Sequence, residues 1–464
     1  MKNKSLSILC AALINALAIH GASAAATDAE IAKLGGELTP VGAQRSANAD
    51  ASIPAWSGET AIPQGEWSYG KNRGDFWKHK DEKTLFTIDA SNVDQHADKL
   101  SPGQVAMIKQ TPGYEMRVYP AHRECSYPDF VLENTKAGAK ISKIAADGWS
   151  LEDARLPGVP FPVPKTGIEA MWNYLTRYQG VGVVTENALA SVSPRPGTTG
   201  GVATRFNQVA YYPWGRKGSM SPKDINYVQQ GFYYAFQEPV ALAGQALVQT
   251  IYMNKDAESF YYFTGQRRVR RLPNYAYDTP IIGFENQFPN DSIFLFYGNP
   301  DRFDWKLVGK KEMYVQYNNF KMLDTSLKTQ GLERPYIDND ARRYELHRVW
   351  VVEGTVKDGV RHSASKKVFY LDEDTWLAVA GEDYDANNFL WRHKESSVIP
   401  IWELGACSNT ATYYLHDLVS GRYVTDSNVS GGTRDLRFYA EAGDLPQFKD
   451  SFYTAESLRA ISDR

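Results

Sequence analysis

A cluster of positive charge lies at residues 267–271, shortly after an aromatic segment at 260–263. The members of this arginine run are Arg267, Arg268, Arg270 and Arg271, with Val269 between them. Because arginines cannot lie unpaired against an apolar core, two interpretations are open. The run forms salt bridges with acidic residues of neighbouring strands, for which Asp301, Asp304 and Glu312 are candidates. Alternatively, it contacts an anionic head group or a partner protein, which the planar guanidinium group suits.

The sequence contains none of the catalytic motifs that local spacing reveals, such as G-x-S-x-G, H-E-x-x-H, a P-loop or C-x-x-C. Its later histidines are scattered and no two have the spacing of metal ligands on a helix: His79, His96, His122, His347, His362, His393 and His416. We therefore expect no catalytic residue, no cofactor and no metal site. An enzyme whose residues lie far apart in the sequence is a remaining alternative.

The acidic triplet at residues 372–374 resembles the start of a calcium-binding loop. It lacks the glycine and the distal glutamate that such a loop requires. We expect a solvated turn between two strands.

The chain begins with a pattern typical of a secretory signal peptide. Two lysines, Lys2 and Lys4, precede an apolar run at 6–19, and small residues follow at 22–24. The apolar run is shorter than the roughly 20 residues that span a bilayer. We expect cleavage after Ala24, with Ala25-Ala26 as the alternative, and no transmembrane span in the mature chain. Removing residues 1–24 takes away two positive charges from a net charge of −3, so nucleic acid is not an expected partner.

Two cysteines remain in the mature chain, Cys125 and Cys407. Exported proteins meet an oxidising environment, in which the two can form a disulfide. Two buried free thiols are the alternative.

Three helices are indicated by caps and apolar periodicity. One fits residues 28–34 after Thr27, and a second fits 102–109 after Ser101. The third, at 168–178, repeats apolar residues at spacings of three and four. Its apolar stripe is interpreted as core in preference to a ligand surface.

Strands dominate after residue 200, in agreement with an aromatic content of 13%. We predict strands at 232–236, 245–253, 259–263, 292–297, 305–315, 344–355, 366–371 and 377–384. Turns are expected at 357–359, where Asp358-Gly359 favours a tight hairpin, and at 372–374 and 385–388. Consecutive hairpins indicate a curved antiparallel sheet or a partly closed barrel.

Several long motifs resemble one known family. They are Leu38–Ala43, Asn48–Asp50 with Ile53–Gly58, Gly158–Pro162 with Gly167–Asn173, Gln266–Arg271 and Asp301–Glu312. They resemble the proteobacterial family catalogued as domain of unknown function 1329, and the resemblance extends over nearly the whole mature chain. Some members end in an arginine-rich tail, whereas Ser457-Leu458-Arg459 is followed here by Ala460-Ile461-Ser462.

The resemblance implies a fold similar to the periplasmic LolA and LolB lipoprotein-sorting proteins. This is a mainly β fold with α-helices: a large antiparallel half-open barrel around an apolar cavity, with helices as a lid. We accordingly expect residues 25–150 to form an N-terminal extension with short helices, and residues 151–464 to form the barrel, both packed as one unit. The resemblance also implies a periplasmic location.

For function, the resemblance favours a periplasmic carrier or receptor for a lipid or other hydrophobic molecule. Family members are often encoded beside a resistance-nodulation-division-type exporter and an outer-membrane-associated protein, which suggests an envelope transporter or outer-membrane partner. The candidate lining residues, each of which could instead be core, are Trp172, Tyr234, Phe236, Tyr262, Trp350 and Trp376. The alternatives are an accessory subunit that docks on the exporter through the arginine run, and an enzyme acting on a lipid or a glycan. An open barrel interior would favour the carrier, and a filled one the docking subunit.

Overall fold

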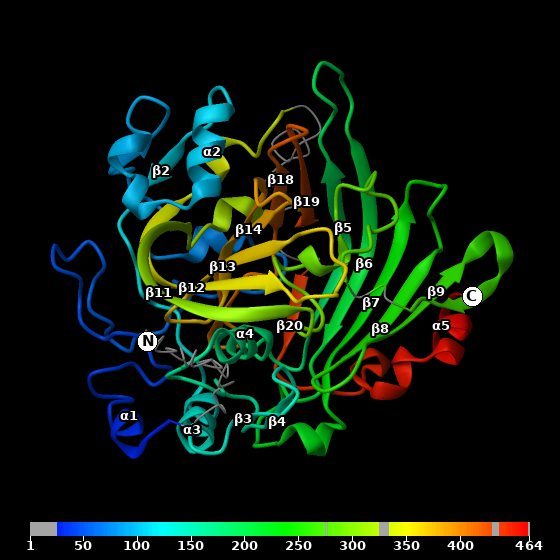
Figure 1. Ribbon diagram of the computed structural model, residues 1–464, viewed down its shortest axis with the longest axis horizontal. Coiled ribbons are helices and arrows are strands. Elements are labelled where there is room, and N and C mark those ends of the chain that lie inside the picture. Colours follow the sequence, from blue (N-terminus) through cyan, green and yellow to red (C-terminus); the bar gives the residue numbers. More distant parts are fainter. Residues whose placement is uncertain (1–25, 274, 276, 324–333, 429–435, 463–464) are drawn as a thin grey trace, which may run out of the picture.

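The computed structural model describes residues 26–462 except 274, 276, 324–333 and 429–435. The expected signal peptide lies outside these residues. The fold is mainly β with a few helices, as expected, and its main element is one sheet of 16 strands (Figure 1). No helix in the described ranges is long and apolar enough to cross a membrane.

The sheet is almost entirely antiparallel. Its main path runs β1-β2-β12-β13-β14-β15-β18-β19-β5-β6-β7-β8-β9-β10, with β11 paired to β12 and β20 paired to β5. The first strands are β1 (Phe86–Ile88), β2 (Met116–Val118), β5 (Gly182–Val192), β6 (Val202–Tyr211), β7 (Val228–Glu238), β8 (Ala246–Tyr252), β9 (Glu258–Phe263) and β10 (Arg268–Arg271). The later ones are β11 (Phe303–Gln316), β12 (Tyr344–Val356), β13 (Lys366–Asp372), β14 (Ala378–Tyr384), β15 (Leu390–Ser396), β18 (Tyr413–Asp417), β19 (Arg422–Asn428) and β20 (Leu436–Tyr439). Two small sheets pair β3 (Lys143–Ile144) with β4 (Leu151–Asp153) and β16 (Ile399–Ile401) with β17 (Ala406–Ser408).

Seven of the eight predicted strands are present. The exception is 292–297, which contains a short 3-10 turn at Asn290–Ser292 followed by irregular chain. Its apolar residues are buried, but they cover the sheet instead of extending it. The expected hairpin after β12 is present, although residues 357–365 separate its strands, so the loop is longer than the tight turn predicted.

The helices begin where the capping residues predict. Thr27 and Ser101 form capping boxes at α1 (Asp28–Ala32) and α2 (Pro102–Gln110). Thr166 caps α4 (Gly167–Leu175), which ends three residues before the predicted end. A Cβ atom on Gly167 would lie 2.6 Å from the backbone of Lys306, so only glycine permits this approach of α4 to β11. Two further helices, α3 (Asp129–Gly138) and α5 (Ala455–Ser462), were not predicted.

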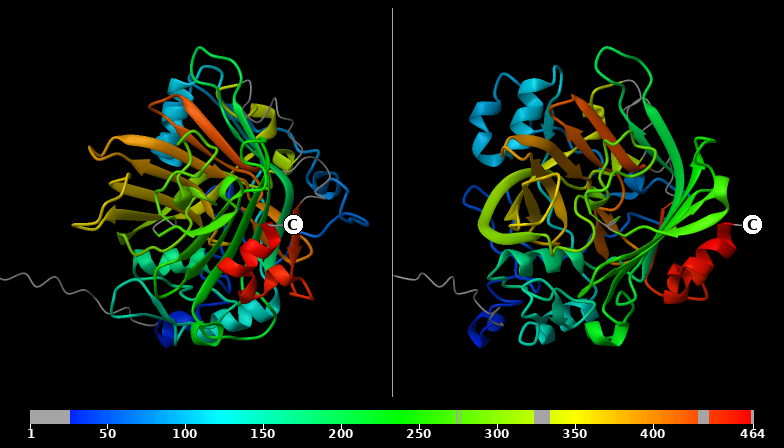
Figure 2. Two further views of the ribbon diagram at one scale, coloured as in Figure 1. Left: turned by 90° about the vertical axis from the view of Figure 1, so that its right-hand side faces the viewer. Right: turned by 45° about the vertical axis from the view of Figure 1, so that its right-hand side comes forward.

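The two faces of the curved sheet are covered differently. The largest apolar core lies on the concave face, between the sheet, α4 and the chain that precedes β11 (Figures 1 and 2). A second core lies on the convex face of β5–β9, where the C-terminal chain with α5 packs. Figure 2 shows this red C-terminal segment outside the green strands.

The N-terminal part of the chain joins the same sheet. β1 and β2 extend it beyond β12. Cys125 and Cys407 form a disulfide, the first of the two alternatives that the sequence left open. This bond links residues 282 positions apart. The division into an extension and a barrel at residue 150 stays a prediction.

Candidate functional site

Aromatic side chains line the concave face of the sheet. On β7 and β9 they are Phe232, Tyr234, Phe236 and Tyr261, all almost completely buried. They do not face an open barrel. They face residues 277–301, here called the covering segment, which forms no strand and contains one isolated bridge between Pro280 and Pro289.

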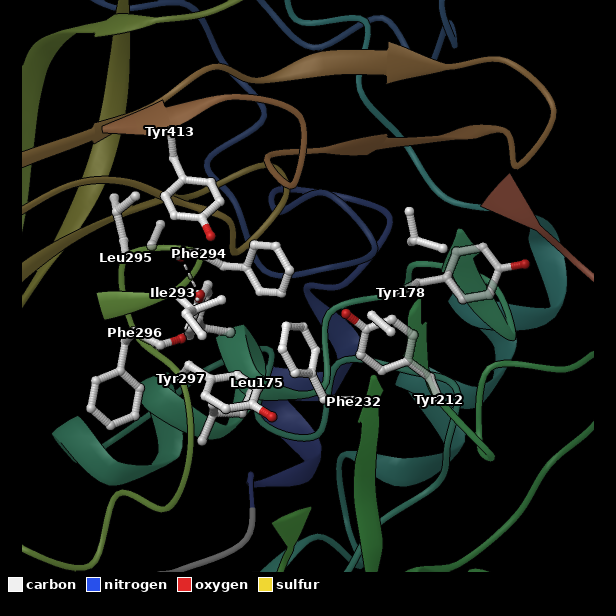
Figure 3. Close-up of a cluster of buried hydrophobic side chains, with 14 of the residues drawn as sticks. Leu175, Tyr178, Tyr212, Phe232, Ile293, Phe294, Leu295, Phe296, Tyr297 and Tyr413 are labelled. Carbon is white, nitrogen blue, oxygen red and sulfur yellow. Dashed lines mark hydrogen bonds between the residues drawn. The ribbon is translucent and has the colours of Figure 1, made fainter. Parts of the chain in front are cut away.

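The covering segment buries its own apolar residues against this face. Phe232 lies 5.3 Å from Tyr297 between ring centroids, and Phe294 lies 5.4 Å from Tyr413 (Figure 3). The hydroxyl of Tyr174, on α4, donates hydrogen bonds to the carbonyl oxygens of Phe294 and Phe296. The segment therefore fills the space over the concave face of the sheet.

A small void lies between the sheet and the covering segment. It has a volume of about 20 Å³ and is lined by Tyr234, Phe236 and Tyr261 from the sheet and by Phe284 and Ile293 from the segment. A cavity of about 10–15 Å³ accommodates one water molecule, whereas ligand pockets measure about 300–1,000 Å³. The interior is filled in this conformation.

A buried ionic cluster fastens the covering segment to the sheet. The Oδ2 atom of Asp291 lies 3.0 Å from Nζ of Lys367 on β13 and 2.9 Å from Nε2 of His362. On the neighbouring strands, Lys394 Nζ lies 2.8 Å from Asp383 Oδ1 and donates to the carbonyl of Leu295 at 3.2 Å. We call Asp291, Lys367, His362, Asp383 and Lys394 the latch.

The electrostatics of the latch favour the ionised form of Asp291, the latch residue that the covering segment contributes. Burial opposes ionisation of Asp291, but the charge of Lys367 and the hydrogen bond from His362 hold its pKa well below the usual range. Burial also lowers the pKa of Lys394 to about 8, against the opposing effect of Asp383. Removing the Asp291 charge would leave two buried lysines, Lys367 and Lys394, to share the single carboxylate of Asp383, which is costly.

Other features weaken the closed arrangement. Phe294 and Leu295 have φ angles of 52° and 77°, the left-handed region that bulky residues avoid. Each such residue costs about 1–3 kcal/mol. Among the described residues, the amide group of Asn290 and the hydroxyl of Ser292 are buried without a hydrogen-bond partner. Unpaired buried polar groups cost roughly 1–3 kcal/mol each, so the segment is held with strain.

The structure brings most of the predicted lining residues to the concave core. Tyr234 and Phe236 line the void, and Trp172 is buried on α4. Trp350 and Trp376 stack at 6.1 Å between centroids beside β12–β14. Tyr262 differs from the expectation, because its side chain belongs to the core on the convex face. Side chains alternate along β9, so Tyr261 takes the inward position instead.

The arginine run forms β10 and the turn before it. All four arginines are exposed, and the strand pairs only with β9 in the described part of the chain. The proposed salt bridges to Asp301, Asp304 and Glu312 are absent among the described residues, so that interpretation is wrong. Asp304 and Glu312 lie on β11, which pairs with β12, and the sheet path places β10 at its far end.

The acidic turn at 372–374 is buried, not solvated as predicted. Asp374 accepts hydrogen bonds from Arg123, and Glu373 accepts one from Lys310. The N-terminal chain that carries Arg123 covers this turn. Nothing local in the sequence reveals that cover, because Arg123 and Asp374 are 251 positions apart.

Comparison with known proteins identifies the family. The model of the family described as Protein of unknown function (DUF1329) matches residues 87–459. The chain belongs to the DUF1329 family. The uncharacterized protein PA3922 of Pseudomonas aeruginosa is 38% identical over 407 residues, which cover 86% of this chain and 88% of that protein.

This DUF1329 protein also has similar solved structures. A domain named for outer-membrane lipoprotein sorting, from Vibrio parahaemolyticus, is 13% identical with a TM-score of 0.44 and covers 63% of this chain and 98% of its own. A DUF1329 family protein from Desulfovibrio piger is 17% identical with a TM-score of 0.40, covering 59% and 92%. The LolA superfamily protein NE2245 from Nitrosomonas europaea is 14% identical with a TM-score of 0.36, covering 63% and 98%.

Sequence reasoning missed the latch and one histidine cluster. Asp291 and Lys367 stand in unremarkable contexts, and only the fold places them together. His79 and His122 were noted as scattered histidines, yet their rings stack 3.6 Å apart. Each is followed within three positions by a glutamate, Glu82 and Glu124, which is the one local signal that could have singled them out.

Proposed function

We propose that this protein is a periplasmic carrier or receptor for a lipid or another hydrophobic molecule, and that it acts by binding and not by catalysis. The observation that supports the proposal is the aromatic concave face covered by an irregular, strained segment. Cargo would bind where residues 277–301 now lie. The disulfide supports an oxidising compartment outside the cytoplasm.

A filled interior, taken alone, favours the docking subunit. The conformation of the covering segment that fills the interior favours the carrier instead. A permanent core is expected to be regular and free of strain, whereas the covering segment holds two left-handed bulky residues and unpaired polar groups. Hydrophobic cargo would replace the apolar contacts of the segment at about 25 cal/mol per Å² of buried surface. The strain and the unpaired groups are relieved at the same time.

The test is mass spectrometry of organic extracts from protein purified gently out of its native periplasm. A stoichiometric hydrophobic molecule, absent from a control periplasmic protein, is the expected result and would name the cargo class. Protein that stays folded, yields no such molecule and refuses added fatty acid or phospholipid would refute the carrier.

A second function is favoured by the arginine run. Four exposed arginines stand on a strand at the end of the sheet, without an acidic partner among the described residues. An acidic envelope protein could add a strand to β10 and pair with these charges. In this second function the protein is an accessory subunit that docks on a transporter or outer-membrane protein. Such docking is compatible with the carrier function, because cargo could be exchanged between the two proteins.

The docking role predicts a contact that depends on charge. A photo-crosslinker placed at Val269 should capture a discrete envelope protein in cells, and the triple substitution Arg268→Gln, Arg270→Gln and Arg271→Gln should abolish the capture. A crosslinker at Phe389, an exposed residue on the β14–β15 turn, serves as the control. Capture unaffected by the triple substitution, or binding of the purified protein to anionic vesicles in place of a protein, would contradict this role.

A further inference from the structure

Two histidines and two glutamates meet on the N-terminal part of the chain. His79 Nε2 lies 3.3 Å from Glu124 Oε1, and His122 Nε2 lies 2.7 Å from Glu82 Oε1. His79 Nδ1 is also 3.3 Å from the same Glu82 oxygen. One donor atom each from His79, His122 and Glu124 lie within 4.8 Å of one another.

The two separations of 3.3 Å are close to those of a metal site, whereas the 2.7 Å between His122 and Glu82 is a hydrogen-bond distance that an ion would lengthen. Ligands at about 2.0–2.1 Å around a tetrahedral zinc ion lie roughly 3.3–3.5 Å apart. A pair of imidazoles with carboxylates favours zinc and its neighbours over calcium or magnesium, which prefer oxygen ligands alone. The second oxygen of Glu124, Oε2, is buried and has no hydrogen-bond partner in the described part of the chain. Only 9% of Glu124 is exposed, and its other oxygen, Oε1, already pairs with Lys78, so Oε2 is the atom of this carboxylate that is free to bind an ion.

The surrounding chain holds the four side chains in place. Arg343 NH2 lies 2.7 Å from Glu82 Oε2, the oxygen that faces away from the histidines. The backbone N–H of His122 donates to Glu345 at 2.8 Å. Cys125, next to Glu124, is anchored by its disulfide. Such outer contacts orient metal ligands and adjust their affinity.

An ion can reach this cluster from solvent. The side chains of His79, Glu82 and His122 are 25%, 22% and 16% exposed. Beside them lies a polar cleft of about 380 Å³, which Glu82 and Trp77 help to line.

We infer that His79, His122, Glu82 and Glu124 bind a divalent transition-metal ion of the zinc class. The ion joins the turn that carries His79 to the extended segment that carries His122, two parts of the chain otherwise linked there by hydrogen bonds. This site lies on the N-terminal chain, shares no residue with the covering segment or the latch, and goes beyond the proposed carrier function.

Binding of the ion requires two side chains to move. The two imidazole rings are nearly parallel, with 14° between their planes, so their lone pairs cannot both point at one ion. The ring of His79, the more exposed of the two, turns out of the stack toward the ion. Lys78, whose Nζ lies 2.5 Å from Glu124 Oε1, is displaced toward solvent.

The experiment uses the mature protein without an affinity tag, stripped with a chelator and then dialysed. Zinc titration by calorimetry should give one ion per chain, and zinc should raise the melting temperature. Cobalt, as a spectroscopic substitute, should give the intense visible bands of a tetrahedral site. His122→Ala and Glu124→Gln should each weaken zinc binding by at least about tenfold.

The matched control is His96→Ala, which removes a histidine that stacks on Phe86 away from the cluster. It should leave zinc stoichiometry and affinity unchanged. Far-UV circular dichroism checks that each variant is folded, and Glu124→Gln, which preserves shape, covers the case in which His122→Ala fails to fold. The inference is overturned if wild-type protein binds zinc no more tightly than the double variant His79→Ala/His122→Ala, or if His96→Ala weakens binding equally.

Discussion

Asp291 is the residue whose replacement tests most directly whether the covering segment opens. Asp291→Asn keeps the shape of the side chain and removes the charge that faces Lys367 and His362. Removing one partner of a buried ion pair costs about 3–5 kcal/mol, because the remaining charge stays buried. Here Lys367 and Lys394 would be left to share Asp383 alone.

This loss acts on the closed conformation. If cargo binds only when the segment is displaced, its apparent affinity is reduced by the fraction of protein that is open. Lowering the cost of opening by about 3 kcal/mol therefore raises affinity by up to roughly 100-fold, since each 1.4 kcal/mol corresponds to a factor of ten. The gain stops once the segment is mostly open, so we expect an increase of about ten- to 100-fold.

The assay measures two quantities on the same protein. Thermal unfolding reports stability, and titration with a fluorescent fatty acid reports affinity for a hydrophobic ligand. For Asp291→Asn we expect the melting temperature to fall while the affinity rises. General loosening of the fold would lower stability without producing saturable binding at one site.

Asp383→Asn is the matched control, because it removes a carboxylate from the same cluster but from strand β14. Asp291 would keep Lys367 and His362, so the segment stays fastened. Stability should fall and affinity should not rise. The reasoning is refuted if folded Asp291→Asn binds the fatty acid no better than wild type, or if Asp383→Asn gains as much.

Three further results are expected. Cys125→Ser should lower the melting temperature, because opening a loop closed over 282 residues removes on the order of 4–5 kcal/mol in the loop-entropy model; an unchanged temperature would contradict it. Although burial opposes it, two carboxylates raise the pKa of His347 to about 9, so its contribution, full below about pH 6.5, should fade by about 3 kcal/mol as the pH rises to 9. Denaturant titration across this range should show the loss in wild type and not in His347→Gln. Tyr261→Ala and Tyr262→Ala should both destabilise by about 3–5 kcal/mol, but only Tyr261→Ala should change fatty-acid affinity, and equal changes would contradict the inward position of Tyr261.

Local rules predicted the elements of this fold well. Thr27, Ser101 and Thr166 cap their helices because a hydroxyl followed three residues later by glutamate or glutamine satisfies the free N–H groups. Most strands could be found from alternation and aromatic content. The same criteria wrongly predicted a strand at 292–297, because a short apolar run that covers a sheet cannot be distinguished from a strand by its pattern.

The candidate sites were harder to predict because they depend on contacts between distant residues. Nothing near Asp291 in the sequence shows that Lys367 will face it, and the 42 residues between His79 and His122 give no sign that the two rings stack. At the arginine run, charge alone led to a wrong prediction of salt bridges, because the acidic residues that follow it in the sequence lie on β11, which pairs with β12. Burial of an acidic turn likewise required knowledge of which segment covers it.

A filled interior is what a carrier of hydrophobic cargo needs while it is empty. An uncovered aromatic face in water would forgo about 25 cal/mol for every Å² exposed and would invite aggregation. With residues 277–301 in place, loading becomes an exchange of one apolar contact for another, so the net free energy is small and cargo can also be released. In the carrier that we propose, the left-handed Phe294 and Leu295 favour opening, the Asp291 latch favours closure, and the balance between them would set how readily cargo enters.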